Sequence, residues 1–529
     1  MRNYIVTILV LLICLLSGHE AYAKSVRIVA SMPIQEQLNM PNSTYIINDE
    51  IDLKGNTITL PSSSVLRFKK GGSIKNGVLE GNRTKVKATR NNTFHNCVIK
   101  GNWNVDCAYS SMFDDDLDAT LLLKNLSCLS PNIRLSSKRN YSINACEESI
   151  DAEFIGADGK EKPIIKFHTT DPNVSGIKIY GCKIRLRNLI VEDDYAPSND
   201  SIYGKNNATL GNTIAILSRN GVVGQLTVEN CDFRGSTSSS WVASSQTRNC
   251  FVKYCTFTGY MADHGVYCSM KAESFVVDNC SIKDVTHASG LFKVRTSDSL
   301  QLFSISNTTA HNFNGYLAML SLLETPDAKI IFDHIKVTRD EGNHSVFYGF
   351  CMNDETKSLR GHGYNAGRIS ITHCDFGYGY DGNSIIYAGA GNRVCAREIT
   401  YDHVETNESN FGGGMVDEII VNNCTFNDCS GDKGIYISAK EITIKNSSLS
   451  NGKQTNCVFL INYDKDYTNA IVLDKTNISF KTNTVFDVRK GNLLNVNLSK
   501  CRILKSSGPI IKSTDQAEVN YIEKGSVFF

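Results

Sequence analysis

The sequence is poor in proline, in tryptophan and in net charge. Only 9 of its 529 residues are proline and 2 are tryptophan, whereas 39 are glycine. This combination fits a chain with many turns and few rigid linkers. The 55 basic and 54 acidic residues leave a formal net charge of +1. That balance gives no argument for nucleic acid, a membrane surface or long-range attraction of a polyanion, although a local basic patch remains compatible with it.

Long hydrophobic runs are missing after the N-terminus. Arg2 supplies a positive end, Ile5–Leu16 an apolar run and Ala21–Ala23 a small-x-small cleavage site. We therefore expect residues 1–23 to be a signal peptide. The run is too short to span a bilayer, and no later stretch is long and apolar enough to do so. The expected location is the periplasm, the cell surface or the medium, with no membrane span.

The cysteines do not form a metal-binding pattern. There are 18 of them, but no Cys-x-x-Cys pair, and the histidines are scattered along the chain. This argues against a structural zinc site.

What the chain has instead is a repeat, with the pattern apolar-x-Asn-Cys-x-aromatic. A clear copy lies in Ile419–Cys429. Copies recur roughly every 25 residues, a period that marks a solenoid. The Asn position is occupied by Asn230, Tyr254, Asn279, Asn307, Asn423, Asn446, Lys475 and Lys500 in the cleanest copies. Asparagine at a tight bend can adopt the left-handed conformation, so we place this position at a bend and the aromatic residue in the core.

Several cysteines share one slot of the repeat. They are Cys97, Cys231, Cys255, Cys280, Cys374, Cys424 and Cys501. Stacked in register, they would form a column of small buried thiols. Some disulfides remain the alternative, because an exported protein meets an oxidising environment.

The remaining organisation follows from short strands and turns. We expect N-terminal strands and a cap over residues 24–110. An acidic run, Phe113–Asp118, then precedes a short predicted helix at Ala119–Leu126. Strands dominate from about 164 to 510. Long loops interrupt them at about 192–212 and 352–368, and such loops are where binding residues tend to lie.

Together these features resemble the right-handed parallel β-helix, the pectin lyase-like superfamily. The acidic run, helix and following strands also resemble the start of pectate lyases and phage tailspikes, although Arg139-Asn140 replaces the family's Gly-Thr. The resemblance implies an all-β, right-handed parallel β-helix solenoid over residues 111–529, with a short helix near the N-terminal end. Its coils would stack roughly 4.8 Å apart.

The best candidate for chemistry spans two neighbouring repeat units, Asp263–Lys271 and Leu291–Arg295. If Val266 and Phe292 point inward, period two turns Tyr267, Ser269, Lys271, Lys293 and Arg295 outward. Lysine and arginine can neutralise a uronate carboxylate, and a lysine or tyrosine can then remove the adjacent proton for β-elimination. The pair Lys271 and Arg295 is similar to the arrangement in alginate and chondroitin lyases of this fold. Solvated basic residues on an exposed strand are the alternative.

Further residues are candidates for contact with a sugar. The predicted set is Asp263, His264, Trp241, Tyr348 and Tyr387. Tyr267, Tyr348, Tyr387 and Tyr436 recur on successive expected strands. An exposed aromatic row stacks on sugar rings, whereas stacking between coils would be purely structural.

Two further motifs point to other chemistry. Asp193, Asp194 and Asp200 could hold the calcium ion that bridges substrate carboxylates in lyases, or could be a solvated loop. Gly361–Gly363 matches a tripeptide of polygalacturonase-type hydrolases, but the acidic pairs that those enzymes also need are missing nearby. A turn histidine is therefore the default for His362.

Three hypotheses follow. The first is an exported polysaccharide lyase acting on a uronate-containing glycan. The second is a glycoside hydrolase of the same fold, which needs two carboxylates across a cleft. The third is a non-catalytic glycan-binding or surface protein, because no catalytic set is complete.

Overall fold

The structure is a computed structural model. It describes residues 24–88, 92–144, 148–171, 173–196, 211–261, 263–286, 289–297, 299–322, 325–354, 366–387, 395–412, 415–437, 439–462, 469–490, 493–504, 507–513 and 517–529. The chain divides into two compact units. The first runs to Arg139 and includes Ile150–Gly159, and the second comprises Asn140–Ser149 and Lys160–Phe529. The domain boundary expected after residue 110 falls inside the first unit. No helix among the described residues is long and apolar enough to cross a membrane.

The first unit is built from short parallel strands. Its members are β1 (Ser25–Arg27), β2 (Thr44–Ile47), β3 (Glu50–Asp52), β4 (Thr57–Thr59), β5 (Val65–Phe68), β6 (Ser73–Lys87), β7 (Phe94–Trp103), β8 (Ala108–Tyr109), β9 (Asn132–Leu135) and β12 (Phe154–Ala157), with the helices α2 (Ile34–Gln37), η1 (Ser110–Met112) and α3 (Ala119–Leu129). The strands pair in parallel, as in Tyr45 with Leu66. Alternate residues of β2 and β5 are buried, because successive side chains of a strand point to opposite faces.

Helix α3 lies where the sequence predicts a short helix. The Asp118 carboxylate accepts a hydrogen bond from the Leu121 amide at 2.9 Å and so caps the N-terminus. Buried Asn125 accepts from the Ile99 amide at 2.9 Å and donates to the Cys97 carbonyl at 2.8 Å. The helix thereby satisfies backbone groups of β7 that would otherwise form an open edge. The predicted helix is confirmed.

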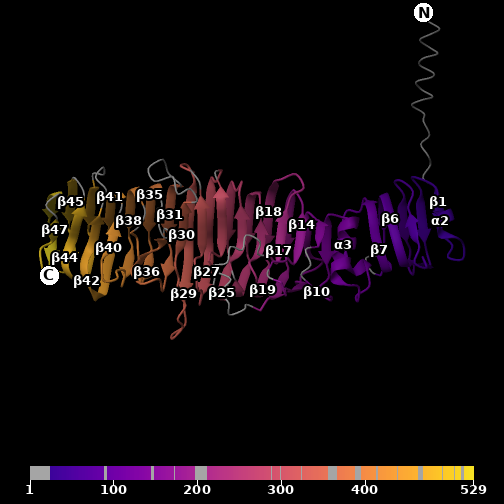
Figure 1. The fold of residues 1–529 in the computed structure, drawn as a ribbon, viewed down its shortest axis with the longest axis horizontal. Helices are drawn as coiled ribbons and strands as arrows, with labels where there is room; N and C mark the ends of the chain where they lie inside the picture. Colours follow the sequence, from indigo (N-terminus) through magenta and orange to yellow (C-terminus); the bar gives the residue numbers. More distant parts are fainter. Residues whose placement is uncertain are drawn as a thin grey trace, which may run out of the picture. The chain divides into compact units, whose positions relative to one another are not determined.

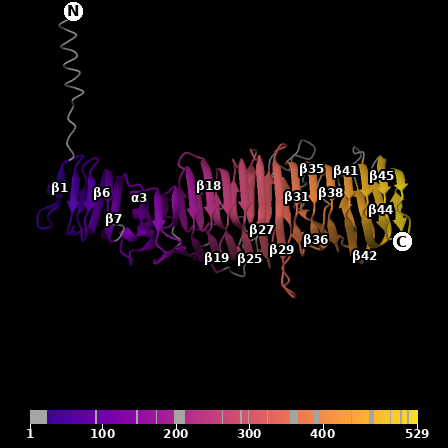
Figure 2. The same ribbon diagram turned by 180° about the vertical axis from the view of Figure 1, so that it is seen from behind.

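The second unit is a stack of coils whose strands pair in parallel with those of the next coil and so form long columns (Figures 1 and 2). The first strand column contains β15 (Lys183–Arg187), β18 (Val223–Glu229), β21 (Thr247–Lys253), β24 (Ser274–Asp278), β31 (Ala366–Thr372), β35 (Cys395–Asp402), β38 (Met415–Asn422), β41 (Ala439–Lys445), β43 (Asn469–Asp474), β45 (Leu493–Ser499) and β48 (Glu518–Lys524). The second contains β10 (Asn140–Asn144), β13 (Ile164–His168), β16 (Ile190–Asp194), β19 (Asp232–Thr237), β22 (Thr256–Met261), β25 (Ser281–Thr286), β32 (Asp375–Phe376), β36 (Glu405–Asn407), β39 (Thr425–Asn427), β46 (Arg502–Ile503) and β49 (Val527–Phe528). Strands β27 (Leu302–His311) and β29 (Lys329–Thr338) pass through both columns.

The third strand column is the one that matters for the site. It contains β14 (Ile177–Tyr180), β17 (Ile214–Leu217), β20 (Ser240–Ser244), β23 (His264–Ser269), β26 (Phe292–Ser297), β28 (Ala318–Leu322), β30 (Phe350–Asp354), β34 (Ile386–Tyr387), β40 (Ile435–Ile437) and β47 (Ile511–Ser513). Strands β42 (Ser448–Asn462) and β44 (Asn477–Lys490) continue from the second column into it. All these pairings are parallel and join each coil to the next. The predicted all-β parallel β-helix is confirmed.

A single left-handed residue makes the bend between the first and second columns. Asn230, Asn279 and Asn423 have φ of 51°, 53° and 52° there, as the repeat predicts. The Asn230 side-chain amide donates to the Asn188 Oδ1 of the preceding coil at 2.8 Å. The bend residue therefore provides both the turn and a link between coils.

Core packing repeats from coil to coil. The rings of Phe233 and Phe257 stack with centroids 5.1 Å apart, and Phe257 meets Phe292 at 5.6 Å. The cysteines that follow the bends, among them Cys231, Cys255, Cys280 and Cys424, are buried free thiols. Among the described residues, the structure therefore agrees with the thiol column rather than with the disulfide alternative.

Candidate functional site

The third column brings together most of the residues predicted to be catalytic. Strand β23 pairs with β26 so that Tyr267 lies opposite Lys293 and Ser269 opposite Arg295. The intervening residues Val266, Cys268, Phe292 and Val294 are buried. Alternation therefore turns Tyr267, Lys293 and Arg295 to the outer face. The Lys293 ammonium lies 5.6 Å from the centroid of the Tyr267 ring.

Lys271 is exposed and lies beyond the end of the strand that carries this face. Strand β23 ends at Ser269, and Met270 and Lys271 follow with positive φ of 53° and 63°. Two consecutive left-handed residues break the extended alternation on which the prediction depends. Strand alternation therefore does not extend to Lys271, and its place in the outward row stays a prediction.

A hydrogen-bonded network lies at the start of these two strands. His264 Nε2 is 3.0 Å from Asp263 Oδ2, and His264 Nδ1 is 2.8 Å from the Gly290 carbonyl on the next coil. The Ser289 hydroxyl donates to Asp263 Oδ1 at 2.6 Å. These contacts fix Asp263, His264, Ser289 and the Gly290 carbonyl relative to one another, across two coils. The side chains of this network and of the neighbouring outer face that a ligand could contact are here called the Asp263 cluster, which comprises Asp263, Tyr267, Ser289, Lys293 and Arg295.

The surroundings of Asp263 and His264 lower the pKa of both groups, for different physical reasons. Burial alone would raise the pKa of Asp263, but the hydrogen bond and charge of His264, with Lys293 and Ser289, lower that pKa to about 2. Burial lowers the pKa of His264, and its contact with Asp263 opposes this. Asp263 is thus a carboxylate near neutral pH, suited to binding a hydroxyl or a cation rather than to donating a proton.

His264 is a positioning residue. Its side chain is only 1% exposed, and both ring nitrogens face protein oxygens. This corrects its assignment as a sugar contact, because a ligand cannot reach the ring. Its contacts hold Asp263 against β26.

Trp241 is also misassigned by the sequence. Its side chain is completely buried and packs against the Phe233 ring, with centroids 5.9 Å apart. The residue lies on β20, where the chain turns its bulk into the core. Without an exposed face it cannot stack on a sugar.

The exposed aromatic row exists, but with different members. Tyr348 lies between Tyr316 and Tyr380, with ring centroids 5.2 Å from each. These three tyrosines come from successive coils, and Tyr380 is 46% exposed. Tyr387 pairs through its backbone with Cys351, and its side chain lies outside the described residues. Tyr267 lies instead beside the His264 ring, with centroids 5.3 Å apart.

The tyrosine row begins beside the Asp263 cluster. The Gly265 amide donates to the Leu291 carbonyl, and the Leu291 amide donates to the Tyr316 carbonyl, both at 2.9 Å. The Tyr348 amide in turn donates to the Gly315 carbonyl at 3.0 Å. The same edge of the third column therefore carries the cluster and, on the next coils, the tyrosines.

A hollow of about 530 Å³ lies at the far end of the row. It is lined by Arg339, Val346, Gly379, Tyr380, Asp381, Glu408, Asp428, Gly452 and Lys453. Its carboxylates are held in place: Asp381 accepts from Lys453 at 2.6 Å and Glu408 from Arg339 at 3.2 Å. The hollow thus places aromatic surface next to charged groups whose positions are fixed by ion pairs.

The expected calcium ligands do not all face one way. Asp193 and Asp194 are neighbours on β16, so their side chains lie on opposite faces. Asp193 is buried and so does not face the same side as the other predicted calcium ligands. The Asp194 carboxylate contacts His168 Nδ1 at 2.6 Å. Asp200 and Gly361–Gly363 lie outside the described residues. Calcium binding stays a prediction.

Sequence reasoning missed Ser289, Tyr316 and Tyr380. None of them belongs to a motif, and Ser289 meets Asp263 across 26 residues. Aligning the repeat units by coil would have placed Ser289 and Tyr316 beside the residues they touch.

Comparisons with known proteins show likeness in structure alone. No protein-family model matches the sequence, and no curated protein matches it. The catalytic domain of a GH87 alpha-1,3-glucanase in complex with nigerose is similar over 80% of this chain and 68% of that chain, with 12% identity and a TM-score of 0.37. Bacteriophage CBA120 tailspike protein 3 is similar over 78% and 60%, with 12% identity and a TM-score of 0.35. The PL6 family alginate lyase AlyGC covers 95% and 100%, with 8% identity and a TM-score of 0.22.

Proposed function

We propose that this protein is an exported, glycan-acting β-helix protein that cleaves a uronate-containing polysaccharide by β-elimination at the Asp263 cluster. The observation that carries the proposal is the pairing of Tyr267 with Lys293 and of Ser269 with Arg295 on the outer face of adjacent strands. Elimination from a uronate can use a guanidinium and an ammonium to neutralise the carboxylate and a tyrosine to move the proton.

In the proposed reaction, Arg295 and Lys293 bind the uronate carboxylate and spread the negative charge that develops when the neighbouring C–H proton leaves. Tyr267, as the phenolate, accepts that proton, the bond to the leaving sugar oxygen breaks as a carbon–carbon double bond forms, and the phenol returns the proton to the leaving oxygen. Asp263 remains ionised and orients a sugar hydroxyl or Lys293. The tyrosine row supports the binding of further sugar units along the same edge.

The test offers the protein pectate, alginate, chondroitin and heparin as substrates. The ultraviolet absorbance of the reaction mixture then reports any unsaturated uronate that forms. Each polymer is offered with and without calcium, because Asp194 and Asp200 remain candidate ligands. We expect Lys293→Ala and Arg295→Ala to lower kcat/KM by about 100-fold or more. Tyr267→Phe keeps the ring and removes only the hydroxyl.

Two controls sharpen this test. Arg368→Ala removes an exposed arginine on β31, in a different strand column, and should leave activity unchanged. Lys271→Ala should also have little effect, because that residue lies beyond β23. Wild-type lyase activity that survives both Lys293→Ala and Arg295→Ala would place the chemistry elsewhere.

Glycoside hydrolysis is the second candidate, favoured by the carboxylates around the hollow beside Tyr380. Reducing ends that appear without unsaturated product, and that Glu408→Gln abolishes, would support it. Glycan binding without either product would support a non-catalytic binder.

A further inference from the structure

Three consecutive bends of the second unit carry histidine where other coils carry asparagine. His334, His373 and His403 have φ of 51°, 51° and 53°. The rings of His334 and His373 stack with centroids 4.7 Å apart, and those of His373 and His403 with centroids 5.3 Å apart. The sequence shows these histidines as scattered, whereas coil stacking makes them neighbours.

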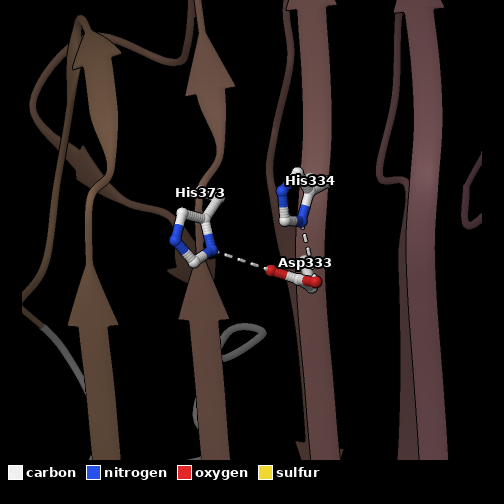
Figure 3. Close-up of side chains that lie close together, drawn as sticks. All are labelled: Asp333, His334 and His373. Carbon is white, nitrogen blue, oxygen red and sulfur yellow. Dashed lines mark hydrogen bonds and ion pairs between the residues drawn. The ribbon is translucent and has the colours of Figure 1, made fainter.

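Asp333 joins two of the histidines (Figure 3). Its Oδ2 lies 2.8 Å from His334 Nδ1, and its Oδ1 lies 3.2 Å from His373 Nδ1. The Thr372 hydroxyl also donates to Oδ1 at 2.6 Å. One carboxylate thus fixes the orientation of two imidazoles from adjacent coils.

An asparagine version of this arrangement occurs in the same unit. Asp278 accepts from the side-chain amides of Asn279 at 2.9 Å and Asn307 at 2.8 Å. A histidine that donates through Nδ1 performs the same structural task. What it adds is the second ring nitrogen, Nε2, whose lone pair asparagine lacks.

Because Nε2 has a free lone pair in neutral histidine, the histidine side chains at these bends can act as metal ligands. Within the described part of the chain, Asp333, His334 and His373 bring ligand atoms within 4.8 Å of one another. Ligand atoms around a zinc ion, at bond lengths of about 2.0–2.2 Å, lie about 3–4 Å apart. The His334 and His373 side chains are 57% and 49% exposed, so small rotations can close this gap without repacking the core.

We propose that His334 and His373, both oriented by Asp333 through Nδ1, form a binding site for a borderline divalent cation of the zinc class. Imidazole nitrogen favours zinc, copper and nickel over calcium and magnesium. A carboxylate that holds the ring opposite a metal is a common supporting contact in such sites. The bound ion would link successive coils.

The experiment is calorimetric titration of tag-free full-length protein with Zn²⁺. We expect saturable binding of one ion per chain, displaced by Ni²⁺ and unaffected by Ca²⁺. The double variant His334→Asn/His373→Asn should bind Zn²⁺ at least about tenfold more weakly. Asparagine tolerates the left-handed bend and keeps the bond to Asp333, so the variant should melt like metal-free wild-type protein.

The matched control is His311→Asn. His311 also contacts an aspartate, Asp340 at 3.3 Å, but does not occupy a bend of this kind. It should leave Zn²⁺ affinity unchanged. No saturable Zn²⁺ binding by wild-type protein, or equal affinity in wild type and double variant, would overturn the proposal. Should the double variant not fold, His373→Asn with Co²⁺ absorption spectra gives the same decision, because nitrogen ligation changes the spectrum.

Discussion

At the residue scale, Asp193 and Asp194 show how strand alternation separates two identical side chains. The Asp193 carboxylate is buried and accepts from the hydroxyls of Thr213 at 2.7 Å and Thr169 at 3.1 Å. Burial, the largest influence, raises the pKa of Asp193 to about 6 despite these bonds. Asp194 faces outward toward His168. The same residue type is therefore a protonatable core group in one position and a surface partner in the next.

This difference predicts a pH dependence of stability. An aspartate in the unfolded chain has a pKa of about 4, so between about pH 4 and 6 folded Asp193 keeps a proton that the unfolded chain has lost. Its contribution is complete below about pH 4 and is lost as pH rises through 6. We expect Asp193→Asn to remove about 2–3 kcal/mol of this pH-dependent difference in the free energy of unfolding.

Urea unfolding across this pH range measures the effect. Asp194→Asn is the control and should change the dependence of the unfolding free energy on pH only slightly, because the Asp194 charge is the smallest of the influences on the pKa of Asp193. If the free energy of unfolding depends on pH equally in wild-type protein and in Asp193→Asn, the pKa of Asp193 is not raised in the folded protein.

At the element scale, the bend between the first and second columns is the repeated unit of this fold. Asn230 combines a φ of 51° with a backbone bond from its amide to the Lys253 carbonyl at 2.9 Å and a side-chain bond to Asn188. Tyrosine, lysine and histidine occupy equivalent bends at Tyr254, Lys475 and His373. The bend geometry is therefore imposed by stacking, and asparagine is the residue that adopts it with least strain.

Replacing that asparagine separates the two contributions. Asn230→Ala should destabilise the protein by about 1–2 kcal/mol, because alanine is strained at positive φ and makes no side-chain bond. Asn230→Gly removes the side-chain hydrogen bond to Asn188, but glycine adopts a positive φ without strain. The glycine variant should therefore be destabilised less than the alanine variant. Denaturant unfolding of both variants gives the comparison, and a glycine variant less stable than the alanine variant would contradict it.

At the scale of the whole molecule, the described thiols range from fully buried to exposed, with Cys107 and Cys128 in between. Cys231, Cys255 and Cys280 follow successive bends and are buried, whereas Cys182 is exposed. Burial raises the pKa of the Cys231 thiol well above its ordinary value. Thiolate is the reactive form, so the column should be inert in the folded protein.

Labelling with a thiol reagent, followed by peptide mass spectrometry, tests this division. In folded protein we expect Cys182 to react quickly, and Cys231, Cys255 and Cys280 to react only after unfolding. Cys182→Ser should remove the fast-labelled peptide without changing the melting temperature. Rapid labelling of Cys255 in folded protein would mean that the coils open locally.

Much of the scaffold could be predicted because its information is local. Each coil repeats the same apolar alternation, the same bend and the same core aromatic, so a sequence period of roughly 25 residues is enough to indicate the solenoid. The helix at Ala119–Leu129 carries its own cap in Asp118. The pairing of Tyr267 with Lys293 also follows from alternation on adjacent strands.

The candidate site could be predicted only in part, because its contacts cross between coils of unequal length. Ser289 meets Asp263 over 26 residues, whereas His373 meets Asp333 over 40. The positions at which strands end also decide where side chains point. Trp241 is buried in the core, and Lys271 lies beyond the end of β23. The sequence by itself determined the coil, its bends and its buried column. Only the tertiary structure decided which side chains meet, since neighbours in a solenoid are one coil apart and coil length is not a local property.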